Sequence, residues 1–194
     1  MNIICNSCAG GHIYKSCFNT SFQNPFIWNL IDFNSMLYMI QHYEKINFKD
    51  YELIKDKNWN FSIIIDKSVK IKYVHYHFNK NYKMITKKGM EIYYNKIWEY
   101  IVQKYEDRIS RMLANKEKPI FVFADWWDRP NDTLLSYDKL KILNELKMDN
   151  IIVAVDKFYP EFSNLKQIER KMPGDKGNGE LGRRIFNKFL RETI

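Results

Sequence analysis

The chain has 194 residues, of which 45% are hydrophobic and 16% aromatic, and its formal net charge is +8. This composition excludes an intrinsically disordered chain and predicts one domain with a substantial core. We recognise no membrane span and no signal peptide, and three cysteines do not make a disulfide framework, so we expect a cytoplasmic protein.

The excess of positive charge suits an anionic partner such as nucleic acid, a phosphorylated cofactor, an acidic glycan or a membrane surface. The lysines are scattered along the chain, however, which is typical of a charge that serves solubility. The aromatic segment YVHYHF (73–78) could stack bases, but no recognisable nucleic-acid-binding module surrounds it. We therefore do not expect nucleic acid as a partner.

Strand-like and helix-like segments alternate along the chain. In order they are a strand at 2–5, a helix beginning in AGGHIYKSC (9–17), a turn at Asn24-Pro25, a helix at 32–46 with Asp32 as N-cap, strands at 61–66 and 70–78, a helix at 90–115, a strand at 119–125, a helix at 137–147, a strand at 150–156, and a glycine-rich loop at 172–182 before a last helix at roughly 180–192.

The strands PIFVFAD (119–125) and NIIVAVD (150–156) are continuously apolar and are separated by a helix. Strands of this kind are typical of a parallel sheet that is covered on both faces. We therefore predict a single α/β domain over residues 1–194, with a mainly parallel sheet flanked by helices.

Three residues with reactive or ionisable side chains stand at or just after the ends of predicted strands. Cys8 lies three residues after the first strand, and Asp125 and Asp156 end the strands at 119–125 and 150–156. Working groups in such sheets lie just past the carboxyl ends of the strands. The pattern predicts an active site at that edge.

The Cys5-x-x-Cys8 pair allows four interpretations. It could be a thioredoxin-like redox pair, although Cys5 lies inside the predicted strand. It could contribute to a zinc site, but a second Cys-x-x-Cys is missing and we predict no metal. That zinc site would draw on Cys5, Cys8, His12 and Cys17, with His75 and His77 as outsiders. Cysteine is also often a small buried hydrophobe, which suits Cys5 and Cys17.

The fourth interpretation makes Cys8 a catalytic nucleophile. A thiol at a helix N-terminus has a lowered pKa, and the backbone amides there can bind an oxyanion. Ala9, Gly10 and Gly11 would let a substrate carbonyl approach those amides closely.

A cysteine nucleophile needs a base, and the chain has four histidines. His12 lies one helical turn after Cys8, and His42 lies on a helix that we expect to be solvated. His75 and His77 share one face of a predicted strand, because strand side chains repeat every second residue. Either of these two is a candidate base.

The base in turn needs an orienting group. Asp125 closes an apolar strand and is the first candidate, with Asp128 and Asp156 as alternatives. Acids at strand ends also serve as ordinary helix N-caps, so both roles stay open for Asp125.

Three motifs together resemble a bacterial family of unknown function that is found in capsule and exopolysaccharide gene clusters. They are NSCAGGHIY (6–14), NPFIW (24–28) and VHY (74–76). The chain departs from that family at Asn24, where serine is usual, and at Ala9, where a large aromatic residue is common. Neither change touches the proposed chemistry.

The chain also resembles a family described as papain-like cysteine peptidases. The shared features are an early cysteine, a Pro-Phe-x-Trp segment, a histidine-bearing strand, and a helix with the pattern seen here as YEDRISR (105–111), followed by KPIFVF (118–123). The two resemblances cover roughly residues 2–125. They imply that Cys8 is the family cysteine, with His75 as the family histidine in the first pattern and His77 in the second.

The resemblance implies modification of surface polysaccharide by a Cys–His acyltransferase, with acyl-coenzyme A as co-substrate and a glycan or sugar-linked molecule as acceptor. The same machinery would act as a hydrolase or peptidase if water were the acceptor. A non-enzymatic binding or structural protein of a glycan locus is the remaining alternative.

The tail segment PGDKGNGELGRR (173–184) contains the pattern G-x-G-x-x-G at the start of a helix. Backbone amides, a helix dipole and basic side chains can together bind a pyrophosphate, as in coenzyme A. The alternative is a loop without a ligand, because no strand immediately precedes the pattern. The candidate phosphate-binding residues are Lys176, Gly177, Gly179, Arg183 and Arg184.

Overall fold

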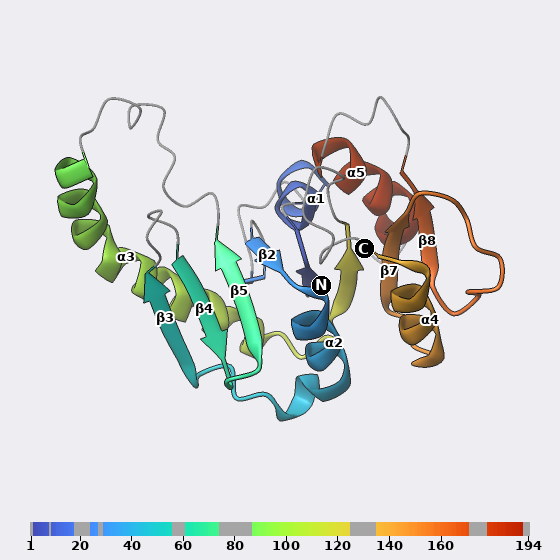
Figure 1. The fold of residues 1–194 in the computed structure, drawn as a ribbon, viewed down its shortest axis with the longest axis horizontal. Coiled ribbons are helices and arrows are strands. Elements are labelled where there is room, and N and C mark those ends of the chain that lie inside the picture. Colours follow the sequence, from blue (N-terminus) through green and yellow to red (C-terminus); the bar gives the residue numbers. More distant parts are fainter. Residues whose placement is uncertain are drawn as a thin grey trace.

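The structure is a computed structural model of the 194-residue chain. It describes residues 2–7, 9–17, 24–26, 29–55, 61–73, 87–124, 135–170 and 178–191. Within these ranges the elements form two four-stranded sheets with helices packed around them (Figure 1).

The first sheet is parallel throughout and has the strand order β1-β6-β7-β8. Its strands are β1 (Ile3–Cys5), β6 (Ile120–Phe123), β7 (Ile151–Val155) and β8 (Lys166–Glu169). Parallel neighbours need crossover connections, and these include α1 (Ala9–Cys17) after β1 and α4 (Tyr137–Glu145) between β6 and β7. The predicted α/β fold with a helix-flanked parallel sheet is confirmed.

The second sheet is antiparallel, with the strand order β2-β5-β4-β3. Its strands are β2 (Asn29–Ile31), β3 (Tyr51–Lys55), β4 (Phe61–Ile65) and β5 (Val69–Tyr73). The short strand β2 joins the two sheets, because the Ile31 amide donates to the Asn6 carbonyl at 3.1 Å. The sequence analysis predicted β4 and β5 as strands but did not predict this separate sheet.

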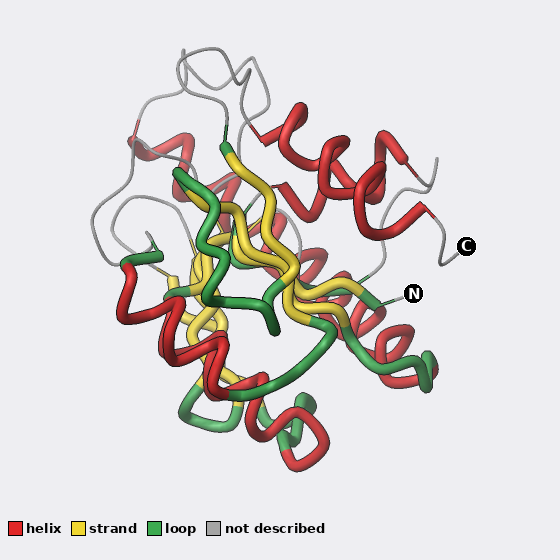
Figure 2. The backbone as a smooth tube through the Cα atoms, turned by 90° about the vertical axis from the view of Figure 1, so that its right-hand side faces the viewer, coloured by secondary structure: helices red, strands yellow, loops and turns green. Residues whose placement is uncertain are grey.

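Helices lie on both sides of the strands, so the molecule is layered (Figure 2). Strand β7 shows how the sequence produces the layers, because every residue of IIVAV is buried and alternate side chains enter different cores. Ile152 and Ala154 face one core, and Ile151, Val153 and Val155 face the other.

The smaller core lies between the parallel sheet, α1, α5 (Asn178–Ile185) and the π-helical turn η3 (Phe186–Leu190). Small side chains such as Ala9 and Ala124 allow these helices to approach the sheet. The larger core contains Phe33, Phe121 and Phe123 and continues to the inner face of the antiparallel sheet. It is covered by α2 (Phe33–His42), α3 (Lys87–Ala114) and α4. The two sheets therefore share one hydrophobic core.

Helix α2 begins where the sequence predicted, because Asp32 acts as its N-cap. One Asp32 carboxylate oxygen accepts the Ser35 amide at 2.9 Å, and the other accepts the Ser35 hydroxyl at 2.9 Å. The helix ends at His42, and a 3-10 turn, η1 (Tyr43–Lys45), completes the predicted 32–46 segment.

Three strands, β2, β3 and β8, were not predicted. Strand β2 has three residues and β8 has four. The charged residues of β3 and β8 interrupt the apolar pattern that would indicate a strand, as YELIK and KQIE show. The last helix begins at Asn178 and therefore takes in the final residues of the predicted 172–182 loop. None of the helices within the described ranges has the length and apolar character needed to cross a bilayer.

Candidate active site

The four predicted catalytic residues, Cys8, His75, His77 and Asp125, lie outside the described residues. The structure does describe the strand ends from which they follow. Strands β1, β5 and β6 all end towards the upper side of Figure 1, where α1 also lies. The described strand ends that precede the four residues in sequence therefore lie on the same side of the molecule.

Asn6 fixes the carboxyl end of β1 to that of β6. Its amide donates to the Val122 carbonyl at 3.1 Å, and its side-chain oxygen accepts the Ala124 amide at 2.9 Å. Asn6 is 1% exposed, so these bonds are shielded from water. The pairing holds the residue before Asp125 against the end of β1.

Ser7 continues this connection and also bonds to the first turn of helix α1. Its hydroxyl donates to the Ala124 carbonyl and accepts the Ala9 amide at 3.3 Å, and its carbonyl accepts the Gly10 amide at 3.3 Å. These bonds form a tight turn that leads into the first turn of α1. The chain on both sides of Cys8 is thus held at the carboxyl edge of the parallel sheet, at the positive end of α1.

The predicted oxyanion residues Ala9, Gly10 and Gly11 occupy the first turn of α1 and are all buried. The Ala9 and Gly10 amides already donate to Ser7. An oxyanion would therefore have to compete with Ser7 for two of the three predicted donors.

Strand β5 ends at Tyr73, which is paired with Asn29 of β2 and Phe61 of β4. Inner residues such as Ile71 are completely buried, so the strand is anchored along its length. His75 and His77 follow this anchored end by two and four residues. The Asn29 side chain donates to the Pro25 carbonyl at 3.1 Å and ties the NPFIW segment to the same sheet.

Asp156, one of the alternative orienting acids, lies at the same edge after β7. Its carboxylate is 3.0 Å from the Arg170 guanidinium, and Arg170 follows β8. The Arg170 side chain is 6% exposed, whereas that of Asp156 is 74% exposed. The sequence analysis missed this buried arginine, because an isolated arginine after a short charged strand has no pattern that marks it. Asp128 lies outside the described residues.

Cys5 lies in the core between the parallel sheet and α1 and is completely buried, as the sequence analysis expected of a small hydrophobe. Its sulfur is 3.8 Å from the Ser7 hydroxyl. Within the described part of the chain, no three His, Cys, Asp or Glu side chains are grouped so that they could hold a metal ion.

The two described histidines have different surroundings. His12 lies on α1, and its Cβ is 3.2 Å from where a side chain on Gly182 would begin. His42 ends α2, and its ring is stacked at a tilt on that of Tyr38, with 4.6 Å between the centroids.

The glycine-rich segment is partly a helix-packing device. Gly182 lies where α5 crosses α1, and an added Cβ would be 3.0 Å from the Ala9 carbonyl oxygen and 3.3 Å from the Ile13 amide nitrogen. A glycine there permits the close approach of two helices, which is a reason for the residue that does not involve phosphate. Gly179 also lies in α5, and Lys176 and Gly177 lie outside the described residues.

The two arginines of this segment differ in their contacts. Arg184 donates to the Glu169 carbonyl, and Lys188 donates to the Gln167 carbonyl at 2.9 Å. Both carbonyls belong to the edge strand β8, so these cations cover an open sheet edge. Arg183 is exposed and makes the better candidate for a phosphate contact.

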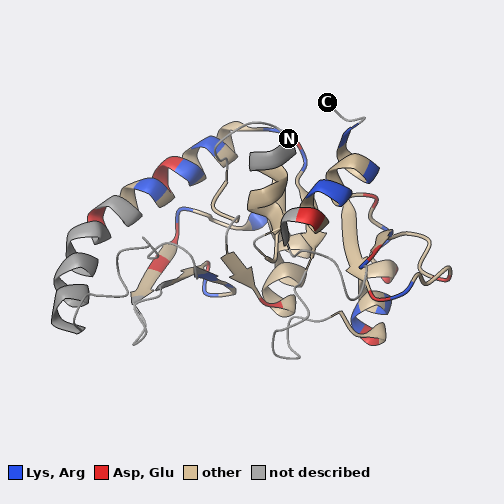
Figure 3. Ribbon diagram, turned by 90° about the horizontal axis from the view of Figure 1, so that it is seen from above, with Lys and Arg blue, Asp and Glu red and all other residues tan. Residues whose placement is uncertain are grey.

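Basic side chains on the described elements are interspersed with acidic ones and do not gather on a single face (Figure 3). This distribution agrees with the scattered lysines of the sequence.

No protein-family model matches this chain, and the searches of curated proteins and of solved structures also return no match. The resemblance to the two families therefore stays a prediction. The argument for a function depends on the geometry at the carboxyl edge of the parallel sheet.

Proposed function

We propose that this protein is a cysteine-nucleophile acyltransferase of surface polysaccharide biosynthesis, with Cys8 as nucleophile and His75 or His77 as base. The observation that supports this most is the set of hydrogen bonds made by Ser7. It holds the neighbours of Cys8 at the start of α1, beside the end of the strand that precedes Asp125. A thiol in that position is exposed to the positive field of the helix, which favours the thiolate.

The proposed reaction has two halves. In the first, the Cys8 sulfur attacks the thioester carbonyl of acyl-coenzyme A, and the bond from that carbonyl to the coenzyme A sulfur breaks. The imidazolium donates its proton to the departing thiolate. In the second, the imidazole takes the proton of a glycan hydroxyl, the hydroxyl oxygen attacks the acyl group, and the bond to Cys8 breaks.

The amides of Ala9 and Gly10 already donate to Ser7, so they are less available to bind an oxyanion. The proposal places more of that role on the Gly11 amide and on the amide of Cys8 itself. We further propose a cytoplasmic location and no membrane span, in keeping with a nucleophilic thiol and a coenzyme A donor.

The first test is a search for the acyl-enzyme. Purified protein is incubated with acetyl-coenzyme A without acceptor, and the peptide that contains Cys8 is examined by mass spectrometry. We expect one acetyl group on Cys8, and its loss when an acceptor sugar is added. Cys8→Ala should abolish labelling, and Cys5→Ala serves as the matched control because Cys5 is a buried core residue.

The alternatives give different results. Release of free acetate without acceptor would assign the protein to the hydrolases. If acetyl-coenzyme A neither acylates Cys8 nor raises the melting temperature of the protein, the acyltransferase proposal is wrong. Separate His75→Gln and His77→Gln variants identify the base, since only its loss should stop acylation at neutral pH.

A further inference from the structure

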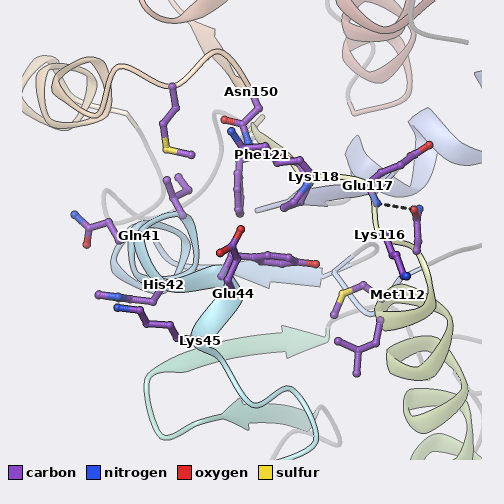
Figure 4. Close-up of a pocket in the computed structure, with 16 residues that line it drawn as sticks. Gln41, His42, Glu44, Lys45, Met112, Lys116, Glu117, Lys118, Phe121 and Asn150 are labelled. Atoms are coloured by element: carbon purple, nitrogen blue, oxygen red, sulfur yellow. Dashed lines mark hydrogen bonds between the residues drawn. The ribbon is translucent and has the colours of Figure 1, made fainter.

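A pocket of about 460 Å³ lies at the amino-terminal edge of the parallel sheet, away from the strand ends that lead to the candidate catalytic residues. Its walls come from the end of α2 with η1, from the end of α3 and the segment after it, and from the starts of β6 and β7 (Figure 4). A volume of this size is in the range of small-molecule sites. One of the quoted segments, KPIFVF (118–123), contributes Lys118, Pro119 and Phe121 to it.

The apolar part of the pocket is formed by aromatic and methionine side chains. Phe121 and Tyr43 are in edge contact, with 6.2 Å between ring centroids, and Met112 and Met148 also line the pocket. The Tyr43 hydroxyl is held in place by the Asn2 side chain, which donates to it at 3.0 Å. The Tyr43 ring is partly exposed, and the buried Phe121 and Met112 side chains support it from behind.

Asn150 supplies an unsatisfied hydrogen-bond acceptor. The side chain is 8% exposed, and its nitrogen donates to the Pro119 carbonyl at 2.7 Å. This bond fixes the orientation of the carboxamide. The side-chain oxygen is buried and accepts no hydrogen bond from any described residue. Buried acceptors are nearly always paired in folded proteins, so this oxygen suits a ligand that carries an N–H donor.

Charged side chains surround the opening. Lys45, Lys116 and Lys118 are exposed and line it, together with the acids Glu44 and Glu117. In Figure 4 the Lys118 side chain lies beside Phe121, whereas the carboxylate end of Glu117 is turned away from it. The side of the pocket next to the α3–β6 segment therefore presents ammonium groups to an anion.

We propose that this pocket binds a nucleoside phosphate with an amino-bearing base, such as adenosine monophosphate. The exocyclic amino group donates to the Asn150 side-chain oxygen, and the base rests against the Tyr43 ring. Lys116 and Lys118 bind the phosphate. This site is separate from the proposed acyl transfer, and it does not depend on Cys8 being a nucleophile.

The test is isothermal titration calorimetry on the full chain with adenosine monophosphate, inosine monophosphate and adenosine. Inosine monophosphate replaces the amino group with a carbonyl, and adenosine lacks the phosphate. We expect each of the two comparison compounds to bind at least about tenfold more weakly than adenosine monophosphate, because each loses a hydrogen-bonded or charged contact.

Variants locate the binding. The double change Lys116→Gln with Lys118→Gln should weaken adenosine monophosphate binding by about tenfold or more, because it removes the phosphate partners. The same change at Lys70 and Lys72, two exposed lysines of β5, is the matched control and should leave binding unaltered. Cys8→Ala should also leave it unaltered. No heat of binding at millimolar nucleotide, equal affinity for the inosine compound, or unchanged affinity in the Lys116 and Lys118 variant would each overturn the proposal.

Discussion

The two ends of the parallel sheet use asparagine in different ways. At the carboxyl end, Asn6 is committed to backbone groups of β6 and aligns the strand ends around Cys8 and Asp125. At the amino end, Asn150 uses its nitrogen for the Pro119 carbonyl and leaves its oxygen without a described partner beside a pocket. The first end is built to hold the chain in position, and the second has the unsatisfied group of a binding site.

The comparison also shows which kinds of site a single sequence can indicate. Candidate residues at the carboxyl end follow strands and stand in short motifs. The pocket at the amino end is assembled from residues 40–45, 112–113, 115–119, 121, 148 and 150, and no single motif connects these segments. The following changes test whether the two ends have the separate roles described here.

The largest expected effect on stability is at Asn24, whose side chain is hydrogen-bonded to the start of β1. Its side-chain nitrogen donates to the Asn2 side chain at 2.8 Å and to the Ile3 carbonyl at 2.6 Å, and its oxygen accepts the Phe26 amide at 2.8 Å. Asn24→Ala removes three buried bonds and should lower the free energy of unfolding by about 3 kcal/mol. Urea denaturation measures it. Asn34→Ala, on the exposed face of α2, is the control, and an equal loss there would show that the network is unimportant.

The next effect is at Gly182, where α5 meets α1 at the carboxyl end. Gly182→Leu places a side chain against the Ala9 carbonyl oxygen and the His12 Cβ, at 3.0 and 3.2 Å from its first carbon. We expect the free energy of unfolding to fall by about 2 kcal/mol, since overpacking outweighs the better helix propensity of leucine. Arg183→Leu in the same helix, at an exposed position, should be nearly neutral. Unchanged stability in Gly182→Leu would show that the packing of α5 on α1 does not require a glycine at this position.

A smaller effect on stability, joined to an effect on chemistry, is expected at Ser7. Ser7→Ala removes the bond to the Ala124 carbonyl and the acceptor of the Ala9 amide, at a cost of about 1 to 2 kcal/mol. It should also slow alkylation of Cys8, because the start of α1 is no longer held in position. Ser136→Ala is the matched control, because Ser136 caps α4 through the Lys139 amide at 3.4 Å. Equal rates of Cys8 labelling in both variants would show that the Ser7 hydrogen bonds do not affect the reactivity of Cys8.

The last expected effect appears only at high pH. Burial raises the pKa of Tyr14 to about 12, although the Ile3 amide, which donates to its hydroxyl at 3.0 Å, opposes the shift. Because the folded pKa lies above the unfolded value of about 10, this contribution to stability is complete below pH 10 and is lost as the pH rises towards 12. Tyr14→Phe should therefore show a shallower decline in the free energy of unfolding over that interval. If the free energies of unfolding of the wild type and of Tyr14→Phe fall in parallel between pH 10 and pH 12, the raised pKa of Tyr14 is contradicted.

The fold could be predicted where the local pattern and the tertiary environment agree. The strands at β6 and β7 are fully apolar and have both faces buried, and Asp32 is a cap with its partner three residues on. Strand β8 could not be predicted, because KQIE reads as polar and is a strand through pairing with Val153 and Val155. Long-range pairing overrode local preference there.

The candidate site was predictable to a different degree at each residue. The position of Cys8 between a strand and a helix could be inferred from NIIC and AGGHIYKSC, and the elements on either side are confirmed. The role of Ser7 could not be inferred from the sequence, because its partner Ala124 is 117 residues away. Gly182 was assigned to a possible phosphate loop, since a sequence pattern does not show that a glycine faces a neighbouring helix.

The most direct test of the central claim is the rate at which iodoacetamide modifies each cysteine of the native protein as a function of pH. We predict that Cys8 reacts at least about tenfold faster than Cys5 and Cys17 at neutral pH, with a midpoint below the usual thiol pKa of about 8.5. Modification of Cys8 that begins only when the protein is unfolded, or that proceeds no faster than modification of buried Cys5, would contradict the account.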